Sequence, residues 1–178
     1  MAGINEHLPF LPVSIAILTV SDSRTEATDK SGKVLVDRLQ AAGHKLADRA
    51  IVADEVAAIT AQLSEWIGNP EIDVVISTGG TGVTGRDVTP EAFESVFEKT
   101  IPGFGELFRM QSLETIGPST IQSRATAGIA GGTYLFALPG SPGACRDAWD
   151  NILLLQLDSR FRPCNFVEMM PRLREHLE

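Results

Sequence analysis

Four segments of strand length divide the chain, and most of their side chains are apolar. Residues 13–20, 72–77 and 133–138 are nearly continuous apolar runs, and residues 45–52 form a weaker candidate. Continuous runs of this length, rich in β-branched side chains, are typical of parallel strands buried on both faces. We therefore predict that these four segments are strands of one sheet.

Apolar residues between these segments recur at helical spacing. The pattern predicts helices at residues 31–42 and 56–67, and Asp54 can cap the second of them. Thr89-Pro90-Glu91 predicts another helix start, with Thr89 as the N-cap and Pro90 in the first turn. Further helical stretches are expected at residues 106–115, at 120–127 and after residue 142.

The alternation of strands and helices predicts an α/β fold with helices on both faces of the sheet. A length of 178 residues suits one domain with a sizeable core. We expect residues 1–12 to be an N-terminal extension, residues 13–170 to form the domain and residues 171–178 to be a short C-terminal tail.

Composition narrows the classes of partner. The formal net charge of −8 argues against a basic nucleic-acid-binding face, so phosphate groups need local donors. No apolar run reaches the roughly 20 residues that span a bilayer, and the N-terminus lacks the pattern of a signal peptide. Cys145 and Cys164 form no CxxC pair and fit no zinc spacing, which favours reduced thiols and a cytoplasmic setting.

Polar loops follow the predicted strands at residues 21–24, 53–55, 78–87 and 139–143. In open α/β sheets, ligands bind beyond the carboxyl ends of the strands. Two of these loops are rich in glycine, and three carry an aspartate. They could therefore converge on one cleft.

The glycines favour a phosphate as the ligand, because a backbone without side chains can approach a phosphate and aim its N–H groups at it. The predicted helix starts at Thr89 and Pro142 add a favourable dipole. Several polar side chains could assist, and for each the alternative is ordinary turn chemistry or solvation. They are Ser21, Thr81 and Ser141 as donors, and Arg24 and Arg86 as clamps for anionic groups.

The segment Gly80-Thr81-Gly82-Val83-Thr84-Gly85 has the spacing of a dinucleotide-binding fingerprint. That fingerprint normally opens the first βα unit, with an acid about 20 residues further on. Here it follows the third strand candidate, and Asp87 comes at once. No Gly-Lys-Ser/Thr follows, as a P-loop requires. Nicotinamide binding is therefore a minor alternative, and the P-loop is excluded.

Asp87 and Asp54 are the candidate acids of the site. Asp87 could be a magnesium ligand, because Mg²⁺ combines a few carboxylates with phosphate oxygens and water. It could equally cap or pair with the helix that starts at Thr89. Asp54 could bind the metal or cap its own helix, and the two roles are compatible.

Two groups of residues are expected to lie outside the chemistry. The three histidines are absent from the candidate loops, so a histidine nucleophile–base pair is not expected; they are His7, His44 and His176. An apolar group is expected in the core or at a subunit interface rather than on the substrate; it consists of Phe104, Phe108, Leu113 and Ile116.

Taken together, these motifs resemble the MoaB/MogA family of molybdenum-cofactor biosynthesis proteins. The resemblance rests first on residues 77–82 (STGGTG) and 86–92 (RDVTPEA). It extends to residues 16–22, 102–106, 123–125 and 138–141, and residues 162–166 (RPCNF) resemble the MoaB branch. It covers roughly residues 13–166, and the combined motifs are highly specific.

The resemblance implies a three-layer α/β/α fold around a mostly parallel mixed sheet, assembled as a homotrimer or homohexamer. It implies that Mg²⁺ and ATP serve to adenylylate the terminal phosphate of molybdopterin, with release of pyrophosphate. A MoeA-type partner would then insert molybdate or tungstate. The alternative is a MoaB-type module that binds molybdopterin or a pathway partner without turnover.

Site residues are carried over position by position. Asp54 and Asp87 match the family's two acidic positions, associated with catalysis and Mg-ATP. The phosphate and pterin loop is matched by Thr78, Gly79, Gly80, Thr81 and Gly82, and the loops that close the pocket by Ser21, Asp22, Pro139, Gly140 and Ser141.

Overall fold

The computed structural model of the protein describes residues 2–175 and contains one mixed, mostly parallel sheet of six strands. Its strand order is β3-β2-β4-β7-β6-β5, and the first four strands run parallel to one another. The last two run antiparallel. The bounds are β2 (Ser14–Val20), β3 (Lys45–Val52), β4 (Val74–Thr78), β5 (Lys99–Thr100), β6 (Thr126–Ala130) and β7 (Thr133–Leu138). The expected sheet class is confirmed.

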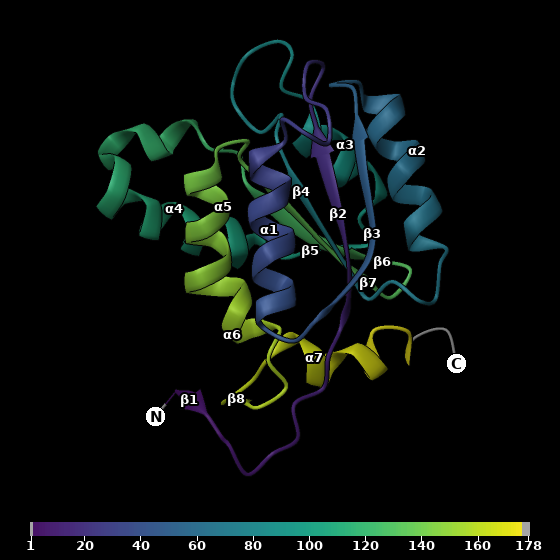
Figure 1. The fold of residues 1–178 in the computed structure, drawn as a ribbon, viewed down its shortest axis with the longest axis vertical. Helices are drawn as coiled ribbons and strands as arrows, with labels where there is room; N and C mark the ends of the chain where they lie inside the picture. The colour runs from purple at the N-terminus through teal and green to yellow at the C-terminus, as the bar shows by residue number, and fades with distance from the viewer. Residues whose placement is uncertain (1, 176–178) are drawn as a thin grey trace.

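Helices cover both faces of this sheet (Figure 1). Along β2, Ile15 and Ile17 face one layer, whereas Ala16 and Leu18 face the other, because side chains alternate along a strand. One layer contains α1 (Lys30–Ala41), α4 (Pro102–Ile116) and α5 (Pro142–Ala148), and the other contains α2 (Val56–Ile67) and α3 (Thr89–Val96). The three-layer architecture is therefore confirmed.

The predicted helix at residues 120–127 is wrong. A 3₁₀ helix, η1 (Gly117–Gln122), precedes β6, which pairs antiparallel with β7. Gly131 and Gly132 form the two-residue connection between these strands, with φ of 57° and 85°. Two positive φ angles are typical of the tight turn of a β-hairpin, which explains why β6 and β7 pair antiparallel.

Both predicted helix caps are also wrong. Glu55 rather than Asp54 precedes α2, and Val88 rather than Thr89 precedes α3. Thr89 is the first helical residue, and its hydroxyl donates to the carbonyl of Gly79 at 2.9 Å. These two polar side chains are thus directed to the loops rather than to the helix ends.

The terminal segments pack at the opposite end of the sheet from the loops that follow β2, β4 and β7 (Figure 1). Strand β1 (Gly3–Ile4) pairs antiparallel with β8 (Phe161–Arg162), so part of the predicted extension is paired with the domain. A π-helical turn, η2 (Trp149–Leu153), and α6 (Leu154–Gln156) continue α5, and α7 (Phe166–Met169) with η3 (Met170–Arg172) follow β8. Of the predicted tail, residues 176–178 lie outside the described part. Within residues 2–175, no helix is long and apolar enough to cross a membrane.

Candidate functional site

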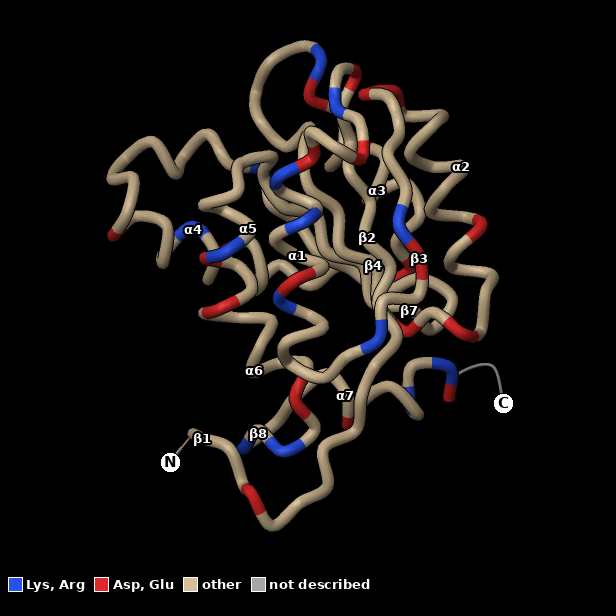
Figure 2. Tube along the Cα trace, viewed as in Figure 1, with Lys and Arg blue, Asp and Glu red and all other residues tan. Residues whose placement is uncertain are grey.

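Three loops meet at the carboxyl ends of the central strands. The Gly79 N–H donates to the carbonyl of Leu138 at 3.0 Å, and the Thr78 hydroxyl donates to the carbonyl of Pro139 at 2.9 Å. Charged residues gather on the loops at this edge (Figure 2). The convergence expected from adjacent parallel strands is therefore present.

Glycines are needed where the loop after β4 begins. Gly79 has φ of 111°, and a Cβ there would lie 2.2 Å from the carbonyl oxygen of Val20. Gly80 has φ of 62°, and its Cβ would lie 2.3 Å from Oγ1 of Thr89 and 2.8 Å from Oδ1 of Asp54. No larger side chain fits either position, so the backbone at this turn is bare and the Asp54 carboxylate lies against it.

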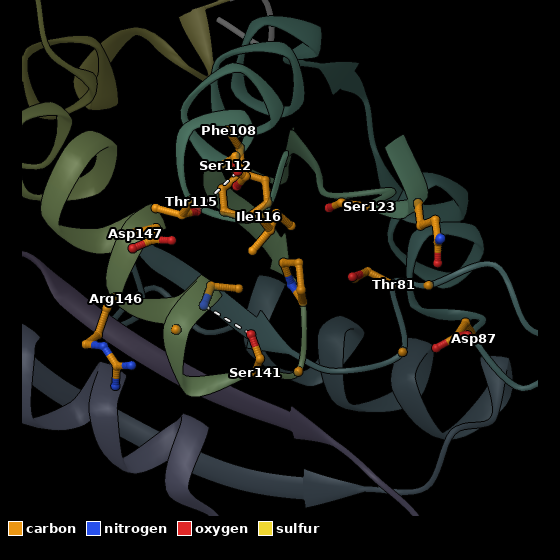
Figure 3. A pocket seen from close by; sticks show the side chains of 17 residues that line it. Thr81, Asp87, Phe108, Ser112, Thr115, Ile116, Ser123, Ser141, Arg146 and Asp147 are labelled. Carbon is orange, nitrogen blue, oxygen red and sulfur yellow. Dashed lines mark hydrogen bonds between the residues drawn. The ribbon is translucent and has the colours of Figure 1, made fainter. Parts of the chain in front are cut away.

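A pocket of about 660 Å³ opens beside this turn. Figure 3 shows Thr81 and Asp87 at one end and Arg146 and Asp147 at the other. The candidate residues that line it are Gly80, Thr81, Gly82, Asp87, Pro139, Gly140 and Ser141. A second cavity of about 140 Å³ is lined by Ser21, Thr78, Gly79 and Gly140, together with Arg24. Asp22 and Asp54 line neither cavity; Asp54 contacts Gly80 of the first, and Asp22 contacts Asp54.

The apolar wall of the larger pocket corrects one expectation. Ile116 of α4 is exposed and lines it, and Phe108, which is buried in the core as expected, also contributes to its wall. Phe104 is buried in the core as expected, and Leu113 is an exposed residue on α4. Because α4 lies far from the glycine loop in sequence, only the tertiary fold places its side chains opposite that loop.

Asp87 is held by the tip of its own loop. Its Oδ2 accepts hydrogen bonds from the Thr84 N–H at 2.9 Å and the Thr84 hydroxyl at 2.6 Å. The Thr84 hydroxyl in particular holds the pKa of Asp87 below its usual range, against the opposing effect of burial. Asp87 is therefore a fixed carboxylate at neutral pH.

Asp54 has the opposite electrostatic setting. Burial raises the pKa of Asp54, and the negative charge of Asp22 raises it further. Its backbone N–H donates to Oδ1 of Asp22 at 3.1 Å, and the other oxygen of Asp22 pairs with Arg86. The hydrogen bond from Arg86 lowers the pKa of Asp22. The two candidate acids thus lie against the same glycine-rich loop, but their pKa values are displaced in opposite directions.

The donor set at this edge is oxygen-rich. No group of three or more His, Cys, Asp or Glu side chains among residues 2–175 is arranged to hold a metal. His44 is buried next to Phe10 and Trp149, and its Nδ1 accepts the Val13 N–H at 3.3 Å. No histidine is found among the described residues that line the larger pocket. The chain alone forms no closed metal cage, but two carboxylates beside a bare backbone turn fit an Mg²⁺ ion that takes its other ligands from phosphate and water.

Arg124 is the residue of this edge that the sequence analysis missed. It follows η1, and its guanidinium donates to the carbonyls of Gly82 and Asp87, each at 2.7 Å. A third contact joins it to Glu91. The loop it contacts lies roughly 40 residues earlier in the sequence, so no local sequence pattern predicts these hydrogen bonds.

Comparison with known sequences gives one consistent result. Residues 16–159 match a family model described as a probable molybdopterin binding domain. Molybdenum cofactor biosynthesis protein B of Escherichia coli K12 is 55% identical over 157 residues, which cover 88% of this chain and 92% of that protein. The protein of the same name from Bacillus subtilis is 43% identical over 158 residues, covering 87% and 93%.

Solved structures agree with the sequences. A crystal structure of Molybdenum cofactor biosynthesis protein B matches with a TM-score of 0.84 and 41% identity, covering 93% of this chain and 98% of that one. The tungsten cofactor synthesizing protein MoaB from Pyrococcus furiosus matches with a TM-score of 0.71 and 37% identity, covering 80% and 91%. The chain therefore belongs to the MoaB/MogA family and is a protein of molybdenum cofactor biosynthesis.

Proposed function

We propose that this protein catalyses the Mg-ATP-dependent adenylylation of molybdopterin, giving adenylylated molybdopterin and pyrophosphate. The observation that carries the proposal is that two carboxylates lie against the same glycine-rich loop, Asp54 at Gly80 and Asp87 at Gly82, close enough for the charge of Asp87 to act on Asp54. This loop opens into a pocket large enough for a small-molecule substrate.

The two ends of the pocket suit the two parts of molybdopterin. Backbone groups of the glycine turn and the hydroxyls of Thr81 and Ser141 lie where phosphate groups need donors. Phe108 and Ile116 provide an apolar wall for a flat heterocycle, beyond which lies the polar end at Asp147. The loops after β4 and β7 therefore hold phosphate, and α4 with α5 holds the pterin.

Asp54 and Asp87 would hold the magnesium ion that accompanies ATP. A bound Mg²⁺ supplies charge neutralisation on the phosphate oxygens as the bond to pyrophosphate breaks. The chain's own residues fix the two carboxylates and exclude side chains from the turn, so that phosphates can approach the backbone. This arrangement agrees with a site whose work is positioning and electrostatic stabilisation.

The reaction also explains a site without histidine. The attacking group is a phosphate monoester whose second pKa is about 6, so it is largely dianionic at neutral pH. No strong base is needed to activate it. The oxygen of this phosphate attacks the α-phosphorus of ATP, and the bond to pyrophosphate breaks, so the adenylyl group moves and no proton must be removed.

The decisive experiment incubates the purified protein with Mg-ATP and molybdopterin and measures pyrophosphate. Release that requires both substrates supports the enzyme. Tight binding of molybdopterin without release would overturn the proposal in favour of a non-catalytic binding module for the pathway. Omission of Mg²⁺ is the matched control, because it leaves the pterin end of the pocket unchanged.

The proposal includes self-association as a homotrimer or homohexamer and transfer of the product to a MoeA-type protein in the cytoplasm. Support comes from α4, which lies beside α5 at one side of the fold (Figure 1) and exposes apolar side chains. These are Leu107, Met110, Leu113 and Ile121 with η1. Leu107, Met110 and Leu113 follow one another at three-residue spacing on α4, and a patch of exposed apolar side chains is typical of a protein interface. Light scattering that gives the mass of a monomer would contradict the assembly.

A further inference from the structure

Arg124 links both ends of the loop that carries Asp87. Its backbone N–H donates to the carbonyl of Thr81 at 3.0 Å. Its Nε donates to the carbonyl of Gly82 and its Nη2 to the carbonyl of Asp87, each at 2.7 Å, while Nη1 pairs with the carboxylate of Glu91. One residue from a different part of the chain thus contacts the start of the loop, its end and the helix that follows.

The rest of the loop has few strong ties to the body of the protein. The bonds between Thr84 and Asp87 join two residues of the loop tip and do not attach the tip to the sheet. The Arg86 ion pair with Asp22 lies between exposed side chains, and exposed ion pairs contribute little to stability. Thr89 anchors only the far base of the loop, through its N–H to Gly80 at 3.0 Å and its hydroxyl to Gly79.

We propose that Arg124 is a positioning residue, which sets the place of the Asp87 carboxylate by fixing the carbonyls on either side of the loop tip. The proposal deepens the proposed adenylyl transfer and rests on it for its kinetic consequence. Arg124 does not line the larger pocket, so it acts through the loop and not on the substrate.

The geometry requires arginine and not merely a positive charge. A guanidinium is a rigid planar fork whose donors point in fixed directions, whereas a lysine ammonium is a point donor on a flexible stem. The guanidinium of Arg124 donates to three acceptors that lie in different directions: the carbonyls of Gly82 and Asp87 and the carboxylate of Glu91. Arg109 supports the same segment from α4, since its Nη1 donates to the carbonyl of Ala125 at 3.2 Å.

The test compares Arg124→Lys with Arg38→Lys. Arg38 of α1 makes an equivalent two-pronged contact with Asp150, both bonds at 2.8 Å, and neither residue lines the larger pocket. In Arg124→Lys, we expect hydrogen exchange at the amides of Thr84 and Asp87 to accelerate by about tenfold or more, because the tip opens locally more often. Arg38→Lys should leave these amides unchanged.

Kinetics and metal binding add readouts that a general loss of stability would not produce. Arg124→Lys should lower kcat at least about tenfold while KM for molybdopterin stays within about twofold, because misplacing a reacting group by a fraction of an ångström is costly and the pterin end is untouched. Mn²⁺, used as the probe with a non-hydrolysable ATP analogue, should bind more weakly to Arg124→Lys than to the wild type.

Unchanged loop exchange and unchanged Mn²⁺ affinity in Arg124→Lys would overturn the positioning role. If the wild type releases no pyrophosphate, the proposed reaction fails, whereas exchange and Mn²⁺ affinity still decide the role of Arg124. Glu91→Gln is the second variant and weakens only the outermost contact, a half-exposed pair, by removing its negative charge. Should Arg124→Lys not fold, faster loop exchange in Glu91→Gln supports the proposal, and exchange equal to the wild type overturns it.

Discussion

The loop after β4 and the loop after β7 leave adjacent parallel strands, and each leads into a helix with a proline in its first turn. Nevertheless, they are built differently. The loop after β7 is short and capped by its own residue, since the Ser141 hydroxyl accepts the Ala144 N–H at 3.1 Å. The loop after β4 is long, its helix has no side-chain cap, and its outermost residues, such as Val83, are exposed.

The difference in construction matches a difference in proposed role: the loop after β7 presents phosphate donors, and the loop after β4 places the Asp87 carboxylate. The short loop needs little help to present a hydroxyl and backbone groups, because local contacts set its shape. The long loop brings a carboxylate, Asp87, from beyond the strand end to the pocket, and the contact that ties its end to another segment comes from Arg124. A phosphate cradle can be built locally, whereas placing an acid opposite it requires tertiary contacts.

The largest expected contrast between the loops is catalytic. Asp87→Asn should lower kcat by about 100-fold or more, because it removes a charge from the proposed metal site while one oxygen can still accept from Thr84. Ser141→Ala should cost far less in kcat and about 0.5–2 kcal/mol of stability through the lost cap. Pyrophosphate release and thermal unfolding measure the two effects.

Asp150→Asn is the control for the loss of a surface acid, because Asp150 pairs with Arg38 and does not line the larger pocket. It should retain the wild-type kcat. A Ser141→Ala variant as inactive as Asp87→Asn would break the division of tasks between the two loops.

A smaller contrast lies within the long loop itself. Gly79→Ala forces a Cβ to 2.2 Å from the Val20 carbonyl at a φ of 111°, and we expect a loss of about 1–3 kcal/mol or more in the free energy of unfolding. Gly85→Ala places its Cβ in open space without a positive φ, so it should change stability by no more than about 0.5 kcal/mol. Denaturant unfolding of both variants tests this, and equal losses would show that strain at the base of the loop is not what fixes it.

Much of the fold follows from local patterns. The apolar runs predict β2, β4 and β7 because buried parallel strands need continuous apolar sequence, and helical spacing predicts α1 and α2. Strand β6 was not predicted, and the helix expected at residues 120–127 overlaps its first two residues, because its sequence TAGIA contains small residues with no alternation. The better signal was Gly131-Gly132, since two glycines between short segments are typical of a hairpin.

The candidate site likewise has features that the sequence predicts and features that depend on tertiary packing. Strand ends and glycines predict where the loops meet, because the topology of a parallel sheet brings carboxyl ends together. Phe108 on the pocket wall and Arg124 behind the loop were not predictable, since each depends on how α4 and η1 pack against distant segments. Asp54 was assigned a cap that Glu55 occupies, because propensity alone does not show which way a polar side chain faces.

The smallest contrast we expect is electrostatic. The loop after β4 carries Arg86 and lies close to Asp22 and Asp54, whereas the loop after β7 carries no charged residue. Because burial and then the charge of Asp22 raise the pKa of Asp54, Asp22→Asn should lower that pKa. An asparagine oxygen can still accept the Asp54 N–H, so the loop contact is kept.

The sign of this effect determines the measurement. A lower pKa keeps Asp54 ionised to lower pH, so its proposed metal site should persist further into acid in Asp22→Asn than in the wild type. Activity is a poor readout, since the substrate phosphate itself gains a proton near pH 6. Carboxyl ¹³C NMR titration of Asp54 in the free protein avoids that overlap, with Asp150→Asn as the control. An Asp54 pKa that stays or rises in Asp22→Asn would show that the negative charge of Asp22 is not what raises it, and the proposed electrostatic coupling between these two neighbouring acids would be wrong.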